Sequence, residues 1–165
     1  MILILFLTLF SIITYHNKVY GLAIIISLLP TYLLRFSIFN LPTTLLELMI
    51  LILFLIFLIK DKKYQEINFK LKKKSFNKIP KAWRYLLLLW IIASLLGLVM
   101  NPTLSALGIW RAYFLEPLMF FIVFLYSLNN KKEEKLIFNS FIILISYLFL
   151  IAIYQYFTNW NLGDS

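Results

Sequence analysis

The chain contains no cysteine, a single histidine and few charged residues. Without cysteine there is no disulfide framework, no thiolate site for zinc or an iron–sulfur cluster, and no cysteine nucleophile. One histidine also argues against a histidine-rich metal site. Charged residues make up 14% of the 165 residues, against about 25% in soluble domains. We therefore exclude thiol chemistry and disulfide-rich folds, and we expect neither a metal nor a cofactor.

Apolar residues are abundant instead. They make up 62% of the chain, with a mean hydropathy of +0.89, whereas soluble domains are about 45–50% apolar. A chain of this length cannot bury so much apolar surface in one small core. The composition therefore predicts an all-α integral membrane protein, built as a polytopic bundle of transmembrane helices.

Six apolar stretches can be separated, and about 20 residues are needed to cross about 30 Å of hydrocarbon. The stretch 19–38 is long enough, but Pro30 must kink it or break it into two pieces. The stretch 2–15 has only 14 residues and is short for a span. The sequence thus predicts five or six spans in a single transmembrane domain. The four clear spans are residues 42–59, 82–100, 105–128 and 136–157.

The positive charge is concentrated in one segment. From Lys60 to Arg84 there are ten basic and two acidic residues, which gives this segment +8 of the formal net charge of +9. A short lysine-rich loop between apolar segments stays on the cytoplasmic side of a membrane. We therefore place the loop 60–81 in the cytoplasm, together with the basic residues 131–135. No nucleic-acid recognition motif is present, so we expect anionic membrane lipids as partners and no nucleic acid.

Charged residues at membrane depth are costly, so each is a candidate for function. Glu116 lies 11 residues after Ser105, about 16 Å into a helix of about 36 Å, which is near the midplane. Glu116 either has a direct role in function, forms a structural ion pair, or is a buried protonated acid. Pro117 frees the carbonyl of Tyr113 and can open the helix there. Arg111 lies about 140° from Glu116 around an α-helix, so we expect these two residues to have different partners.

Arg35, Glu47 and Arg111 are all placed at the outer leaflet by this topology. A guanidinium at that level either holds a phosphate through two hydrogen bonds or reaches lipid headgroups. Two arginines suit an anionic, lipid-linked substrate, but an Arg35–Glu47 ion pair that fixes a hairpin explains two of the three residues equally well. Gln155, near the outer end of the last span, is placed to bond a sugar or a neighbouring helix.

Three stretches resemble a known family. Residues 29–48, LPTYLLRFSIFNLPTTLLEL, and residues 106–118, ALGIWRAYFLEPL, are similar to the amino-terminal half of membrane proteins of the O-antigen ligase and O-antigen polymerase superfamily. Residues 153–158, IYQYFT, resemble the helix end that precedes the central region of that family. The resemblance implies a multi-pass glycosyltransferase of the bacterial inner membrane, which acts on undecaprenyl-diphosphate-linked glycans in cell-envelope polysaccharide assembly without an obligate metal.

The resemblance also bears on site residues. Arg35, Arg111 and Glu116 match recurring family positions, and with Glu47 and Gln155 they form the predicted substrate-binding set. The catalytic arginine and histidine of the family lie in its later half, so we assign no catalytic residue and expect a truncated amino-terminal part that is inactive alone. Its partners would be lipid-linked glycan and other envelope-assembly proteins.

Two other hypotheses remain open. The chain is alternatively a small, self-contained binding or transporter subunit in which Glu116 lines a cavity at the midplane. The other hypothesis is that the chain is a purely structural membrane subunit, in which the charged residues only form ion pairs between helices. The family begins in the cytoplasm, which favours the version with five spans, whereas six spans place the amino terminus outside.

Overall fold

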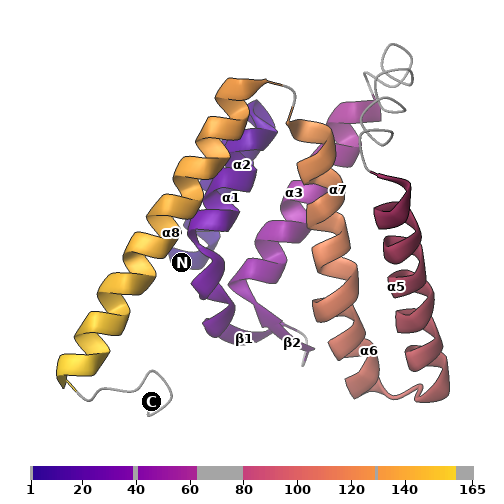
Figure 1. Cartoon of the computed structure of the whole chain (residues 1–165). Coiled ribbons are helices and arrows are strands. Elements are labelled where there is room, and N and C mark those ends of the chain that lie inside the picture. Colours follow the sequence, from indigo (N-terminus) through magenta and orange to yellow (C-terminus); the bar gives the residue numbers. More distant parts are fainter. Residues whose placement is uncertain (1, 39–40, 63–79, 129, 159–165) are drawn as a thin grey trace.

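The computed structural model describes residues 2–38, 41–62, 80–128 and 130–158 as a bundle of helices with one small β-hairpin (Figure 1). This part of the chain is therefore all-α apart from the hairpin. The elements are, in order, α1 (Ile2–His16), α2 (Lys18–Ser27), the 3-10 helix η1 (Leu29–Leu33), β1 (Arg35–Ile38), β2 (Leu41–Thr44), α3 (Leu45–Lys62), α5 (Lys81–Met100), α6 (Leu104–Trp110), the π-helical segment η2 (Arg111–Leu115), α7 (Glu116–Ser127) and α8 (Lys131–Thr158).

Three helices are long and apolar enough to cross a membrane, which indicates a membrane protein. They are α5, the continuous helix Leu104–Ser127 formed by α6, η2 and α7, and α8. Their 20, 24 and 28 residues correspond to about 30, 36 and 42 Å. They confirm helices over the predicted spans 82–100, 105–128 and 136–157.

The first part of the chain is divided differently from the prediction. The stretch 19–38 is not one helix, because α2 ends at Ser27 and the strand β1 follows η1. Pro30 has no amide hydrogen with which to continue the α-helical bonds of α2, and it lies in the first turn of the 3-10 helix η1, so the predicted break occurs here. The second piece is a strand, however, paired antiparallel with β2. The stretch 19–38 is therefore not one continuous helical span in the structure.

The remaining helices are short or charged. At 15 and 10 residues, α1 and α2 reach about 23 and 15 Å, less than the hydrocarbon thickness. The 18 residues of α3 include charged side chains at both ends. The structure therefore supports three spans by length and composition, and a count of five or six is not confirmed.

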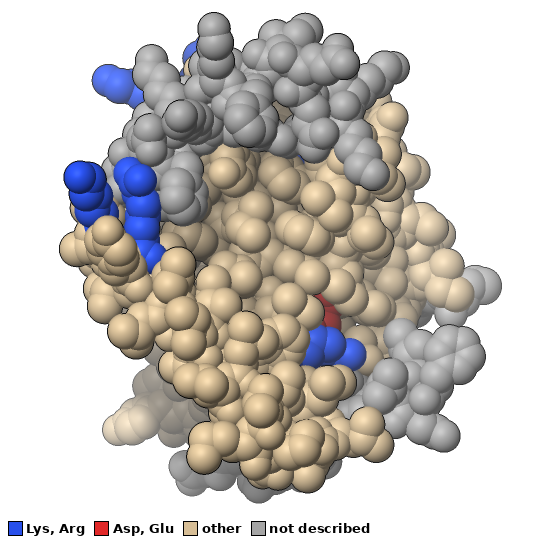
Figure 2. All heavy atoms as spheres, turned by 90° about the vertical axis from the view of Figure 1, so that its right-hand side faces the viewer, with Lys and Arg blue, Asp and Glu red and all other residues tan. Residues whose placement is uncertain are grey.

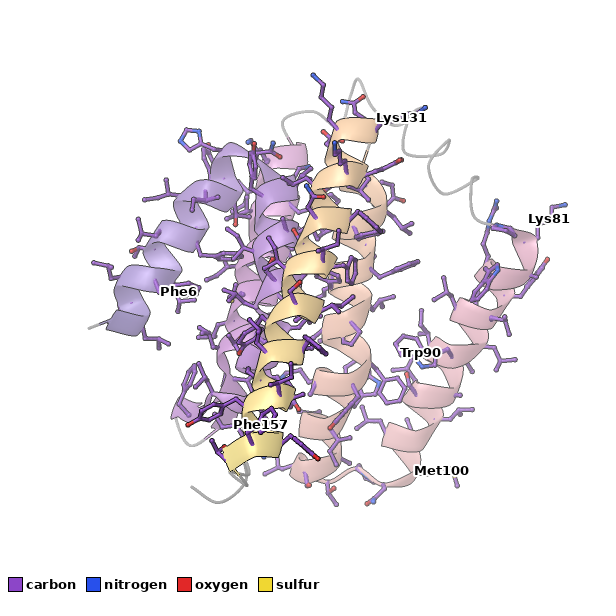
Figure 3. All side chains as sticks on the ribbon, turned by 60° about the vertical axis from the view of Figure 1, so that its left-hand side comes forward. Phe6, Lys81, Trp90, Met100, Lys131 and Phe157 are labelled. Carbon is purple, nitrogen blue, oxygen red and sulfur yellow. The ribbon has the colours of Figure 1, made fainter. Side chains whose placement is uncertain are left out.

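The lysines that begin α5 and α8 lie at the same end of the bundle. Figure 3 shows Lys81 and Lys131 at the same end and Met100 and Phe157 at the opposite end. This agrees with the prediction that the two basic segments share one side. Most of the predicted basic loop, residues 63–79, lies outside the described residues.

At the basic end, a lysine of α3 closes the end of α1. Lys60 Nζ donates to the carbonyl of Tyr15 and, at 3.1 Å, to the carbonyl of His16. These are the last carbonyls of α1, which have no partner within the helix. Lys18 Nζ lies 4.8 Å from the ring centroid of Phe57 on α3. Both lysines thus tie the α1–α2 hairpin to α3.

The core lies where α1, α2, α3 and α7 meet. In contrast, α5 contains one buried residue, Ser94, and α8 has none beyond Leu144. The first half of α8 packs against α2, and its second half exposes apolar side chains. The most deeply buried core side chains are Phe10, Leu22, Ile25, Ile26, Met49, Leu53 and Val123.

A glycine permits the close approach of α1 and α2. A Cβ atom added at Gly21 would lie 2.6 Å from Thr14 Oγ1, 2.8 Å from Thr14 Cγ2 and 3.1 Å from Leu53 Cδ1. Thr14 is fully buried, so its side chain cannot move into solvent. By contrast, a Cβ at Gly97 meets nothing within 4 Å.

We predict that Gly21→Ala lowers stability by about 1–3 kcal/mol, because the added methyl group overpacks the helix contact. The matched control is Gly97→Ala, which should raise stability by about 0.5–1 kcal/mol, since alanine favours a helix over glycine. Thermal unfolding in detergent measures both. Equal effects of the two substitutions would contradict this account of the α1–α2 packing.

A second prediction concerns orientation. The chain has no cysteine, so single cysteines report cleanly on accessibility. Asn101 and Lys132 are exposed at opposite ends of the long helices. In intact cells a membrane-impermeant maleimide should label Asn101→Cys, and it should label Lys132→Cys only after permeabilisation, as the positive-inside rule requires. Labelling of Lys132→Cys alone in intact cells would reverse the orientation.

Candidate functional site

The two longer stretches that carry the family resemblance meet in the structure. Arg111 Nη2 on the 104–127 helix donates to Glu47 Oε2 on α3 at 2.6 Å. A charge-assisted hydrogen bond of this length is a strong one. Residues 64 positions apart in the chain are thereby joined in one site.

Arg111 also reaches the carboxylate that the sequence analysis assigned to another partner. Its Nε lies 3.3 Å from Glu116 Oε1. Residues 111–115 form a π-helical turn, in which the backbone N–H of Glu116 donates to the carbonyl of Arg111. This wider turn brings positions five apart onto the same face, whereas an α-helix would separate them by about 140°. The prediction of different partners was therefore wrong.

Pro117 explains why the helix widens at this point. Proline has no amide hydrogen and its ring clashes with the carbonyl four residues earlier, which is that of Tyr113. A turn closed by bonds between residues five apart relieves that conflict within the continuous span. The predicted disturbance at Tyr113 is confirmed, but as a π-helical turn rather than an opened helix.

The three charged side chains are buried to different degrees. Exposed fractions are 30% for Arg111, 12% for Glu47 and 4% for Glu116. At formal charges the set carries a net −1. A buried carboxylate without a counter-charge is strongly unfavourable, so Arg111 makes the burial of Glu116 tolerable. Glu47 is less deeply buried than Glu116, so its carboxylate depends less on Arg111.

Glu47 is positioned by the hairpin that precedes its helix. Its backbone N–H donates to Thr44 Oγ1 at 3.2 Å, which satisfies one amide at the start of α3. A carboxylate in the first helical turn is further favoured by the helix dipole. Thr44 is the register partner of Arg35 in the hairpin. The hairpin thus places Arg35 near the start of α3.

The predicted Arg35–Glu47 ion pair is not formed. Glu47 pairs with Arg111 instead, and Arg35 is exposed and has no ion pair among the described residues. Arg35 sits on strand β1, near the end of the stretch 19–38 that was predicted as a span interrupted at Pro30. Gln155 lies near the end of α8, whose second half has no buried residue, and no described contact links it to Arg111. The structure therefore brings Glu47, Arg111 and Glu116 together, and leaves Gln155 apart.

The sequence analysis missed two contacts that support the π-helical turn. Trp110 Nε1 donates to Ser94 Oγ at 3.2 Å, and Ser94 Oγ donates to the carbonyl of Ile91 at 2.8 Å. The rings of Trp90 and Phe114 lie with centroids 5.0 Å apart. Trp90 and Ser94 are four residues apart and lie on one face of α5, and Trp110 and Phe114 have the same spacing on the 104–127 helix. This spacing is the sequence signal that could have indicated the two contacts.

Few charged side chains are visible on the face of the molecule drawn in Figure 2. On the face in Figure 2, lysine and arginine side chains gather toward the upper end, and one further group of basic and acidic atoms lies side by side lower on an otherwise tan surface. Arg111 and Glu47 form such a basic and acidic pair, and their side chains are 30% and 12% exposed. In the described ranges no group of three histidine, aspartate or glutamate residues is arranged to hold a metal ion.

Comparison with protein-family models, with curated proteins and with solved structures found no match to this chain. The family resemblance therefore stays a prediction from residues 29–48, 106–118 and 153–158. What can be argued about function depends on the geometry of the site itself.

The ion pairs predict a specific pattern of energetic coupling. Arg111→Gln should destabilise the protein by about 3–5 kcal/mol, because it leaves two carboxylates without their counter-charge. In a double-mutant cycle, Arg111→Gln and Glu47→Gln should couple by more than about 1 kcal/mol. The matched cycle of Arg35→Gln with Glu47→Gln should be additive within about 0.5 kcal/mol. Coupling in the second cycle and none in the first would restore the Arg35–Glu47 pair.

Proposed function

We propose that this chain forms the amino-terminal part of an O-antigen ligase- or polymerase-like glycosyltransferase of the bacterial inner membrane. It would act on glycans linked to undecaprenyl diphosphate during assembly of envelope polysaccharide. The observation that carries the proposal is the 2.6 Å contact between Arg111 and Glu47. This contact joins the two stretches, 29–48 and 106–118, whose resemblance to that superfamily suggested the function.

The chemistry of the substrate supports the same proposal. A diphosphate presents several anionic oxygens, and the planar guanidinium of arginine binds such oxygens in pairs. Arg35 is exposed on the hairpin that leads into α3, and Arg111, which contacts Glu47 of α3, is 30% exposed. Both belong to the end of the bundle away from Lys81 and Lys131. Under the positive-inside rule this end faces out of the cytoplasm.

In the proposed reaction the arginines hold the diphosphate of the carrier lipid. The bond between the anomeric carbon and the phosphate oxygen breaks, and a bond to an acceptor hydroxyl oxygen forms. Lipid diphosphate leaves with the bonding electron pair, which the guanidinium groups stabilise. The proton of the acceptor hydroxyl passes to a general base, a role for which none of the five binding residues Arg35, Glu47, Arg111, Glu116 and Gln155 is proposed.

One observation favours a second candidate function. Glu116 is 4% exposed and lies 12 residues into a span of 24, about 18 Å from its start. A carboxylate at this depth is typical of binding and transporter subunits that carry a site at the midplane. In that case the ligand would approach Glu116, and lipid diphosphate would not compete for Arg111.

The test is binding of undecaprenyl diphosphate to the chain in nanodiscs, followed by native mass spectrometry. Arg111→Lys keeps the positive charge that the carboxylates need but loses the paired donors of the guanidinium. We expect Arg111→Lys and Arg35→Gln each to weaken diphosphate binding about tenfold, equivalent to about 1.4 kcal/mol.

The control substitution is Arg84→Gln, which removes a positive charge at the basic end. It should leave binding unchanged, because only the outward arginines are proposed to contact the diphosphate. Undecaprenyl monophosphate is the control ligand. If the chain binds the two lipids equally, or if Arg84→Gln has the same effect as Arg35→Gln, the proposed function is wrong.

A further inference from the structure

The two carboxylates around Arg111 are not equivalent. Glu47 makes the short contact, 2.6 Å to a terminal nitrogen, whereas Glu116 lies 3.3 Å from the Nε atom nearer the chain. Glu47 is also three times as exposed, at 12% against 4%. A terminal guanidinium nitrogen at the surface is the donor that an incoming phosphate oxygen would use. In this structure a carboxylate oxygen of the protein occupies that position.

We infer that Glu47 is an internal competitor, which holds Arg111 until a diphosphate displaces it. The inference rests on the proposed function, because it concerns the regulation of the same site. With Glu47 in place, the three side chains carry a formal −1 and repel an anion. A ligand that replaces Glu47 at Nη2 of Arg111 must therefore bind the guanidinium more strongly than a single carboxylate does.

The surroundings of Glu47 allow it to leave. Its carboxylate is at the start of α3, where the helix dipole favours a negative charge without Arg111. Its backbone stays anchored, since the N–H donates to Thr44 Oγ1 at 3.2 Å. Only the side chain has to rotate, and its partial exposure gives it access to water. Glu116 has neither option, because its side chain is 4% exposed and lies within the span, directly after the π-helical turn.

Glu116 remains paired with Arg111 when a ligand replaces Glu47. It lies against Nε, whereas Glu47 uses a different nitrogen of the guanidinium, Nη2. A ligand can therefore replace Glu47 while Arg111 still neutralises the buried carboxylate. This division of the guanidinium makes Glu47 a specificity-determining residue, since a diphosphate, with its additional anionic oxygens, competes better than a monophosphate.

The experiment compares Glu47→Gln with the unmodified chain in nanodiscs containing undecaprenyl diphosphate. Removing the competitor should tighten diphosphate binding about tenfold. Combining Glu47→Gln with Arg111→Lys should abolish this gain, since the guanidinium is then absent. The matched control is Glu134→Gln, which removes the same charge from an exposed position near the opposite end of the bundle and should change nothing.

A second arm distinguishes the source of the diphosphate. Inorganic pyrophosphate is titrated in nanodiscs without the carrier lipid. If pyrophosphate also binds more tightly to Glu47→Gln, the headgroup chemistry alone is recognised. If only the lipid does, the polyprenyl chain contributes to recognition. In both cases the gain depends on Glu47, as the inference requires.

The outcomes separate this inference from the proposed function. If Arg111→Lys weakens lipid diphosphate binding but Glu47→Gln leaves it equal or weaker, the competitor role is wrong and the proposed function stands. If no form of the chain discriminates the diphosphate from the monophosphate, the proposed function itself fails. Should Glu47→Gln not fold, Glu47→Asp serves instead: its shorter side chain withdraws the carboxylate, and unchanged binding would overturn the inference.

Discussion

Arg111 is the residue on which the arrangement of the site depends. It lies within a membrane-spanning helix and is paired with a carboxylate of its own helix and with one from α3. Glu116, which is 4% exposed, depends on this pairing most, because a buried carboxylate without a counter-charge is strongly unfavourable. The ion pairs therefore hold the start of α3 against the 104–127 helix, and with it the hairpin that leads into α3.

The π-helical turn makes this pairing possible. Pro117 disturbs the α-helical hydrogen bonds that would end near Tyr113, and the wider turn that results places Arg111 and Glu116 on one face. Trp110 and Phe114, on the same helix, meet Ser94 and Trp90 of α5. An ordinary α-helix through these residues would point Arg111 away from Glu116 and leave a carboxylate buried alone.

The helices fall into two groups with different surroundings. In α1, α2, α3 and α7 apolar residues pack against one another, and Gly21 allows the α1–α2 contact to be close. In α5 and the second half of α8 the apolar side chains are exposed, as expected where lipid rather than protein is the neighbour. Glu47 and Glu116 belong to α3 and α7 of the first group, and Arg111 lies in the π-helical turn that precedes α7. A competitor such as Glu47 suits this position, because it neutralises Arg111 until an anionic ligand arrives.

The sequence by itself determined the membrane character, the three long helices, the break at Pro30 and the common side of the basic segments. These follow from composition, helix length and local backbone restrictions, which do not depend on distant contacts. Only the tertiary structure decided that Glu47 pairs with Arg111 and that Arg35 lies on a strand. The partners of a charge depend on which helices become neighbours and on a change of helical register, and neither can be read from the spacing of residues along one ideal helix.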